Sequence, residues 1–73
     1  MKVKGKDLKV GQQLVTHRDE HNLDLSTIKN MRPYEGIYNE LYPEKYKDVQ
    51  MASVTGLTID LIIHPEQEYE IYE

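Results

Sequence analysis

The chain has 73 residues, 13 acidic and 9 basic side chains, a formal net charge of −4 and no cysteine. This length predicts a single domain over residues 1–73, and the absence of cysteine excludes a disulfide framework or a thiolate zinc site. No apolar run approaches the roughly 20 residues needed to span a bilayer, and no apolar stretch follows the basic N-terminus as it would in a signal peptide. We therefore expect a cytoplasmic protein without a membrane segment.

The two ends of the chain show the alternation of short strands, with opposite charges. Lysines alternate with Val3 and Gly5 near the start, and glutamates alternate with Tyr69 and Ile71 near the end. Side by side, the two strands would set lysines against glutamates, and each such pair is worth a few tenths of a kcal/mol. This pairing predicts a small sheet that closes on itself.

A strand is expected from Gln12 to about His17 with Leu14 inward, followed by a polar loop over residues 18–24. Residues 17–21 also fit the pattern H-x-x-E-H of some zinc proteases. That chemistry needs both histidines on one helical face, with a third ligand from elsewhere. The segment follows a strand pattern and has almost no apolar face, so we expect His17 and His21 to be solvated and predict no metal site and no cofactor.

Leu25, Ile28 and Met31 are three residues apart, which predicts one or two helical turns. Arg32 precedes a proline, and a residue in that position is pushed out of the α region. A break between this segment and the next helix is therefore expected at Arg32.

The main helix is predicted over residues 33–42. Its apolar residues at positions 34, 37, 38, 41 and 42 have the spacing of one helical face. Pro33 suits the first turn, and Pro43 cannot continue the helix. We expect this helix to pack against a sheet.

Four tyrosines recur at every fourth position: Tyr34, Tyr38, Tyr42 and Tyr46. On a helix with 3.6 residues per turn such a row drifts by about 40° per step, so a sheet cannot cover all four side chains. We expect Tyr38 and Tyr42 to be mostly buried, and Tyr34 and Tyr46 at the ends to be more exposed. Exposed tyrosine is typical of contact surfaces between proteins, which makes the row a candidate contact site, including one for a homodimer.

The clearest strand signal is the alternation from Leu57 to Ile63, which follows a turn at Thr55-Gly56. We predict a three-residue loop, Val54-Thr55-Gly56, which pairs Met51 with Ile59 and gives the hairpin a clean apolar face. Glycine would occupy the left-handed position of this loop.

The second half of the chain resembles small uncharacterised proteins of phages and prophages of Gram-positive bacteria. The resemblance covers about residues 33–64 and rests on Leu41-Tyr42-Pro43-Glu44 and the alternating segments that follow. It implies a helix that leads into a β-hairpin and carries over no functional residue. The order of strands also resembles an SH3-like small barrel.

Basic side chains near the start of the chain are candidate phosphate contacts. They are Lys2, Lys4, Lys6 and Arg18. Nucleic-acid binders are usually basic overall, and this chain is acidic, so nucleic acid is disfavoured as a partner. The sequence shows neither a nucleophile with a base nor a glycine-rich phosphate loop.

These patterns predict an α+β domain, with a small antiparallel, partly barrel-like sheet of about four to five strands and one main helix at 33–42. The expected function is that of a non-enzymatic accessory protein that binds another protein, either a different chain or a second copy. A nucleic-acid-associated module is the alternative, and a metal-dependent hydrolase through residues 17–21 is a distant one.

Overall fold

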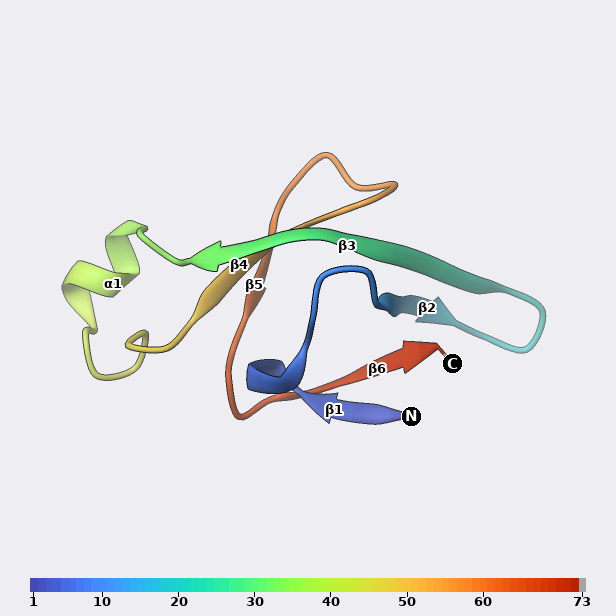
Figure 1. Cartoon of the computed structure of the whole chain (residues 1–73), viewed down its shortest axis with the longest axis horizontal. Coiled ribbons are helices and arrows are strands. Elements are labelled where there is room, and N and C mark those ends of the chain that lie inside the picture. The colour runs from blue at the N-terminus through green and yellow to red at the C-terminus, as the bar shows by residue number, and fades with distance from the viewer. Residues whose placement is uncertain (73) are drawn as a thin grey trace.

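The computed structural model describes residues 1–72, with Glu73 outside the described part, and consists mostly of antiparallel sheet with one short α-helix (Figure 1). In chain order the elements are β1 (Lys2–Lys4), the 3-10 helix η1 (Gly5–Asp7), β2 (Gln13–Arg18), β3 (Leu23–Pro33), α1 (Ile37–Leu41), β4 (Gln50–Val54), β5 (Leu61–Ile63) and β6 (Glu68–Tyr72). Within residues 1–72 the six strands lie in the order β1-β6-β2-β3-β4-β5. An antiparallel sheet with one helix is confirmed, with more strands than the four to five expected.

The sheet is open, so the expected barrel is not confirmed. β1 and β5 form its two edges, and no ladder joins them within residues 1–72. Instead η1 contacts the turn between β5 and β6, where Gly5 N–H donates to the Gln67 carbonyl at 2.8 Å and Lys6 N–H to the Pro65 carbonyl at 3.1 Å. These two bonds hold the start of the chain against the last turn.

The predicted pairing of the two chain ends is confirmed. β1 and β6 are antiparallel, and Lys2 lies opposite Glu70 while Lys4 lies opposite Glu68. The strand around Leu14 is also confirmed, because β2 covers residues 13–18 and Leu14 is buried. Hydrophobic alternation predicts these strands correctly, because side chains alternate between the core face and the solvent face of a strand.

The helical turns predicted around Leu25, Ile28 and Met31 are wrong, because these residues lie in β3, the longest strand. Ser26 and Ile28 are buried and face the core in strand alternation. A bulge between Ile28 and Asn30 then adds one residue, Lys29, to the β3 side of its ladder with β4. The extra residue produces the spacing of three from Ile28 to Met31 that resembles a helix in the sequence.

The predicted register of the second hairpin is also wrong. Met51 pairs with Ile62 rather than with Ile59, and the connection runs from Thr55 to Asp60. Thr55 continues to bond β3, since its N–H donates to the Thr27 carbonyl at 3.0 Å and its hydroxyl accepts from Thr27 N–H at 2.9 Å. The predicted three-residue loop is thus replaced by a longer connection, which begins with a turn at Thr55-Gly56 where Gly56 adopts the expected positive φ of 80°.

The helix predicted over 33–42 is shorter than expected and does not pack against the sheet. Pro33 ends β3 opposite Gln50, and α1 covers only Ile37–Leu41 without a buried residue. The core lies between the strands and contains Leu8, Leu14, Ile28, Ala52, Val54, Ile63 and Ile71. Among residues 1–72, no helix is long and apolar enough to cross a membrane.

Candidate functional site

The connection from β3 to β4 forms a lobe that projects from one end of the sheet (Figure 1). We call residues 34–49 the tyrosine lobe. A hydrogen bond from Tyr34 N–H to the Val49 carbonyl, at 3.0 Å, closes its base directly beside the last β3–β4 pair. Inside the lobe, the Asn39 amide donates to the Tyr34 carbonyl at 3.3 Å, which ties α1 to the end of β3.

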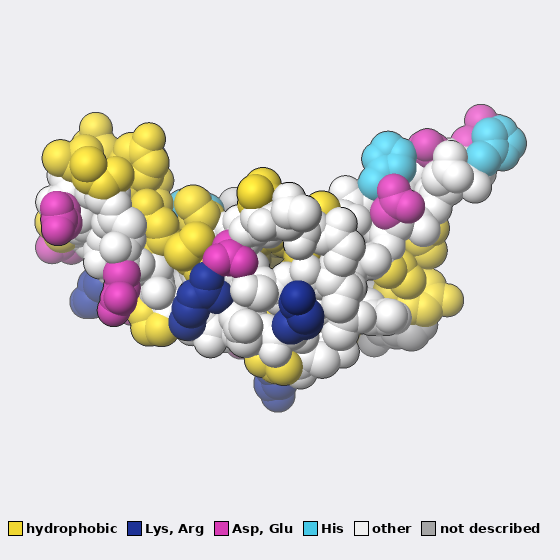
Figure 2. Space-filling model, turned by 90° about the horizontal axis from the view of Figure 1, so that it is seen from above, with side chains coloured by type: hydrophobic (Ala, Val, Ile, Leu, Met, Phe, Trp, Pro, Cys, Tyr) yellow, Lys and Arg dark blue, Asp and Glu magenta, His cyan; other side chains and the backbone are white. Residues whose placement is uncertain are grey.

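Four large hydrophobic side chains are exposed on α1 and at the residue that follows it. We call Ile37, Tyr38, Leu41 and Tyr42 the apolar patch; their exposed fractions lie between 47% and 64%. The pairs 37/41 and 38/42 are four residues apart, so each pair is adjacent on the helix. Figure 2 shows hydrophobic side chains gathered at this end of the molecule.

A chain of tyrosine ring contacts connects the apolar patch to the inside of the lobe. The ring centroids of Tyr34 and Tyr46 are 5.5 Å apart, those of Tyr46 and Tyr38 are 5.8 Å apart, and those of Tyr38 and Tyr42 are 6.5 Å apart. Tyr46 also lies 5.7 Å from the ring of His64, which connects the lobe to the end of β5. Such pairs add about 0.5–1.5 kcal/mol each beyond the area they bury.

The expected burial of the tyrosine row is the reverse of what the structure shows. Tyr34 is buried, with 8% of its surface exposed, and Tyr46 is half-buried, whereas Tyr38 and Tyr42 are exposed. Tyr34 can fold inward because Gly36 has no side chain: a Cβ there would lie 2.1 Å from the Tyr34 hydroxyl. The structure thus brings all four predicted tyrosines together and divides them into two supporting and two exposed rings.

The side chains predicted to contact phosphate do not form a free basic surface. Lys4 and Lys6 both pair with Glu66, at 3.0 and 3.5 Å, and Arg18 pairs with Glu70 at 2.6 Å. The hydrogen bond and charge of Glu66 raise the pKa of Lys4, and the same bond lowers the pKa of Glu66. Lys2 lies opposite Glu70 in the β1–β6 ladder, so acidic neighbours accompany all four basic groups.

The two histidines of the H-x-x-E-H pattern lie on a strand and a turn, not on a helix. His17 is in β2 and its Nε2 donates to Asp19 Oδ2 at 3.0 Å, while His21 is in the turn and its backbone N–H donates to Asp19 Oδ1 at 2.9 Å. These bonds, the one from His17 first, lower the pKa of Asp19. Within residues 1–72 no group of three His, Cys, Asp or Glu side chains is placed to hold a metal ion.

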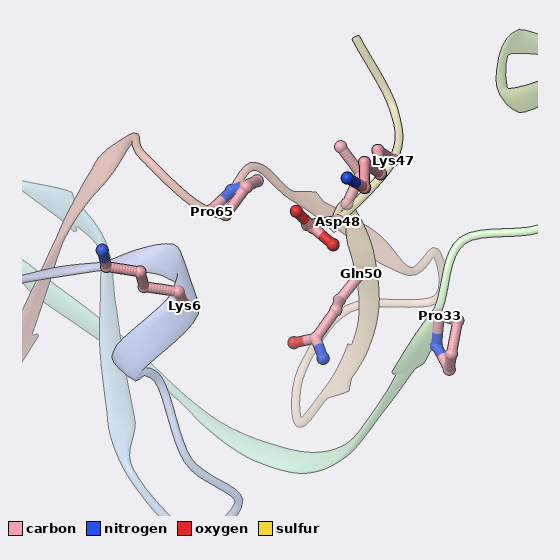
Figure 3. A pocket seen from close by; sticks show the side chains of 7 residues that line it. Lys6, Pro33, Lys47, Asp48, Gln50 and Pro65 are labelled. Atoms are coloured by element: carbon pink, nitrogen blue, oxygen red, sulfur yellow. The ribbon is translucent and has the colours of Figure 1, made fainter. Parts of the chain in front are cut away.

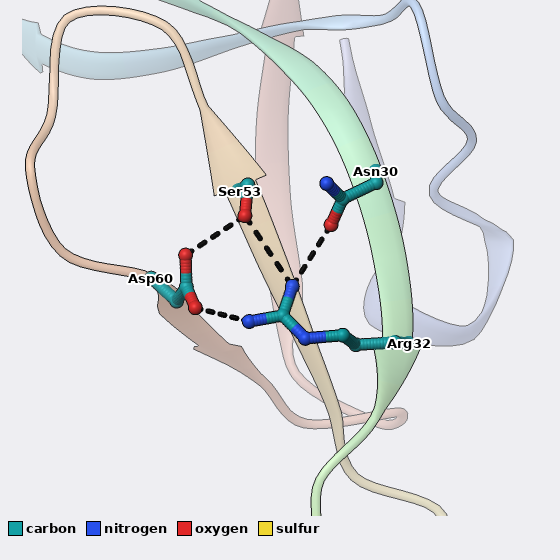
Figure 4. A network of polar contacts seen from close by, with 4 residues as sticks. All are labelled: Asn30, Arg32, Ser53 and Asp60. Atoms are coloured by element: carbon teal, nitrogen blue, oxygen red, sulfur yellow. Dashed lines mark hydrogen bonds and ion pairs between the residues drawn. The ribbon is translucent and has the colours of Figure 1, made fainter.

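A polar network that the sequence did not indicate fixes the 55–60 connection to the sheet (Figure 4). The Ser53 hydroxyl donates to Asp60 Oδ1 at 2.8 Å, and Arg32 pairs with the other carboxylate oxygen. The Arg32 guanidinium also donates to Asn30 at 2.8 Å and to Ser53 at 3.3 Å. The bond from Ser53, followed by Arg32, holds the pKa of Asp60 below its usual range.

Three hollows mark the surface away from the patch. One, of about 290 Å³, has side chains of both charges around it, and Figure 3 shows Asp48 and Gln50 pointing toward it from the β4 side. Its other lining residues are Lys6, Pro33, Lys47, Val49 and Pro65. A second, of about 410 Å³, lies at the start of α1 between Tyr34, Gly36 and Met51. The third, of about 370 Å³, is an apolar groove where Leu57 and Leu61 face Tyr69.

No pattern in the sequence indicates the apolar groove, because the alternation from Leu57 predicts a strand ladder there. The candidate site is therefore the apolar patch at α1, where four large hydrophobic side chains are exposed next to one another along the chain.

Comparison with known proteins adds nothing to this description: no protein-family model, no curated protein and no solved structure matches the chain.

Proposed function

We propose that this chain is a non-enzymatic accessory protein that binds another protein through the apolar patch on α1. The observation that carries the proposal is the exposure of Ile37, Tyr38, Leu41 and Tyr42 on one short helix. Single exposed hydrophobic residues are ordinary, but contiguous ones on a small protein mark interaction surfaces. Tyrosine supplies large contact area with little loss of side-chain entropy, which suits a binding surface.

The arrangement beneath the patch supports the same function. The Tyr46 ring stacks on the exposed Tyr38 ring and lies tilted against the buried Tyr34 ring, so the Tyr38 part of the patch is connected to a buried side chain. A supported surface loses less conformational freedom when a partner covers it, and this favours binding.

The nucleic-acid alternative has less support. Its candidate residues on β1, η1 and β2 are accompanied by Glu66 and Glu70, so a phosphate backbone would have to displace existing ion pairs. The resemblance to phage and prophage proteins assigns no residue a role and leaves the proposal unchanged.

Affinity capture from an extract of the source organism tests the proposal. We expect the wild-type chain to retain a protein that Ile37→Ser/Leu41→Ser does not retain. A matched control is Val10→Ser/Ile59→Ser, which removes two side chains that are just as exposed, at 60% and 70%, but lie outside the lobe. The proposal is wrong if both variants retain the same proteins as the wild type, or if the wild type retains no more than the tag alone.

A further inference from the structure

We infer that the partner at the apolar patch is a short apolar segment flanked by lysine or arginine, and not a second copy of this chain. The inference rests on the proposed function and specifies the chemistry of the partner. It follows from the charges around the patch and from its size.

Three exposed carboxylates accompany the patch along the chain. Glu35 precedes α1, Glu40 lies within it and Glu44 follows it; all three are exposed, and none is in an ion pair with another residue of 1–72. Figure 2 shows acidic side chains beside the hydrophobic cluster at this end. With Asp48, Lys45 and Lys47, residues 34–48 carry four negative and two positive groups, a net charge of −2.

This charge favours a basic partner over a second copy. In a two-fold symmetric dimer the same surface meets itself, so two copies of a segment with a net charge of −2 would be brought together. Like charges brought together at an interface oppose association, whereas opposite charges at the rim speed it and select the partner. Lysine or arginine beside an apolar anchor would meet these carboxylates directly.

The size of the patch points in the same direction. Tyrosine side chains bury about 150–250 Å² each when fully covered and Ile and Leu somewhat less, so four side chains near half exposure offer roughly 400 Å². A stable dimer of standard size needs about 800 Å² from each partner. The patch can therefore hold a short segment of a partner, such as one or two helical turns, but is too small for a durable symmetric dimer.

Selection from a phage-displayed library of random 12-residue peptides tests this inference. The wild-type chain would serve as the target at about 0.15 M salt, where long-range charge effects are screened within about 8 Å. Ile37→Ser/Leu41→Ser would serve for counter-selection, so that only patch-dependent peptides remain. We expect these peptides to combine Leu, Ile or aromatic residues with an excess of Lys and Arg.

A synthetic peptide from that selection then measures the contribution of the charges. We expect Glu35→Gln/Glu40→Gln/Glu44→Gln to weaken its binding about tenfold at low salt, and Asp7→Asn/Asp24→Asn, which changes carboxylates outside the lobe, to leave it unchanged. Sedimentation velocity should show a monomeric wild type over the same concentrations.

The outcomes separate the two proposals. Patch-dependent peptides without excess positive charge, or an unchanged affinity in the triple variant, overturn the basic partner but leave binding at the patch intact. Dimerisation that Ile37→Ser/Leu41→Ser abolishes shows that the occupant is a second copy, which also overturns the inference. A selection that yields no patch-dependent peptide from a monomeric chain contradicts the proposed function together with the inference.

Discussion

At Gly5, the absence of a side chain lets η1 approach the backbone of the β5–β6 turn. A Cβ there would lie 2.1 Å from the His64 carbonyl oxygen, and backbone cannot move aside as the tip of a flexible side chain can. The same glycine donates its N–H to Gln67 across this contact. A single atom position thus determines how the first and last turns of the chain meet.

We expect Gly5→Ala to lower the free energy of unfolding by about 1–3 kcal/mol, the usual range for inserting an atom into a tight contact. Lys6→Ala is the control, because it changes an exposed neighbour in the same turn without adding an atom at the contact. Urea unfolding followed by circular dichroism measures both. Equal, small effects of the two changes would show that η1 does not press against His64.

The Asp60 carboxylate makes the stability of the fold depend on pH. Its folded-state pKa lies below the ordinary value of 3.8, so its carboxylate stabilises the fold above that value. This contribution is lost as the pH falls from 3.8 through the lower, folded pKa. We expect Ser53→Ala to bring the pKa of Asp60 back toward 3.8, because the hydrogen bond that lowers this pKa most is removed.

Carbon NMR of the side-chain carboxyl groups follows this titration directly. Thr58→Ala removes an exposed hydroxyl from the same connection and should leave the titration of Asp60 where it is. An Asp60 carboxyl that titrates identically in the wild type and in Ser53→Ala would contradict the network.

The tyrosines show what a sequence can and cannot reveal at this scale. Their spacing singled out four side chains that come together, but only Tyr38 and Tyr42 meet as residues four apart do on a helix, whereas Tyr46 reaches Tyr34 and Tyr38 because the chain folds back. It did not reveal which rings are buried, because burial depends on Tyr34 folding back over Gly36 and stacking on Tyr46, which follows the helix. The sequence therefore predicts which tyrosines lie together, but it exchanges the buried and the exposed ones.

At the scale of elements, the β4–β5 hairpin is the clearest case of tertiary contacts overriding a local pattern. The alternation through Leu57 and Ile59 is regular, yet bonds between Thr55 and β3 carry the chain beyond the expected turn. A shift in register exchanges the side chains that face the core. Ile59 is consequently 70% exposed and Ile63 is 1% exposed.

The two isoleucines give a matched test of this register. We expect Ile63→Ala to cost about 2–4 kcal/mol of unfolding free energy, as for other buried branched side chains. Ile59→Ala should cost under about 0.5 kcal/mol, since its side chain is already in water. Denaturant unfolding in which Ile59→Ala is the more damaging change would restore the three-residue loop.

A bulge in β3 explains why its sequence resembles helical turns. Strand alternation runs through Ser26 and Ile28, and the bulge at Lys29 then changes the phase before Met31. A bulge leaves no distinct mark in a single sequence, so a period of three cannot be distinguished from the start of a helix. The terminal strands carry no such irregularity in their ladder, and their pairing was predicted correctly.

At the scale of the whole molecule, the chain is elongated, measuring 41 × 23 × 21 Å. The tyrosine lobe projects at one end and the β2–β3 turn at the other, with the core between them (Figure 1). The class of fold followed from composition and alternation, whereas the open sheet did not, because closure depends on whether two edge strands meet. The separation of the lobe from the core allows its surface to change without loss of the fold.

The apolar patch is an exposed surface next to the Tyr34–Tyr46 pair and is not part of the core. The most direct test is the unfolding free energy of Ile37→Ser/Leu41→Ser, measured beside that of Tyr34→Ser. We predict a change under about 1 kcal/mol for the double variant, set mainly by helix propensity, and a loss of about 3 kcal/mol or more for Tyr34→Ser. A double variant that loses as much stability as Tyr34→Ser would place the patch in the core and contradict the account.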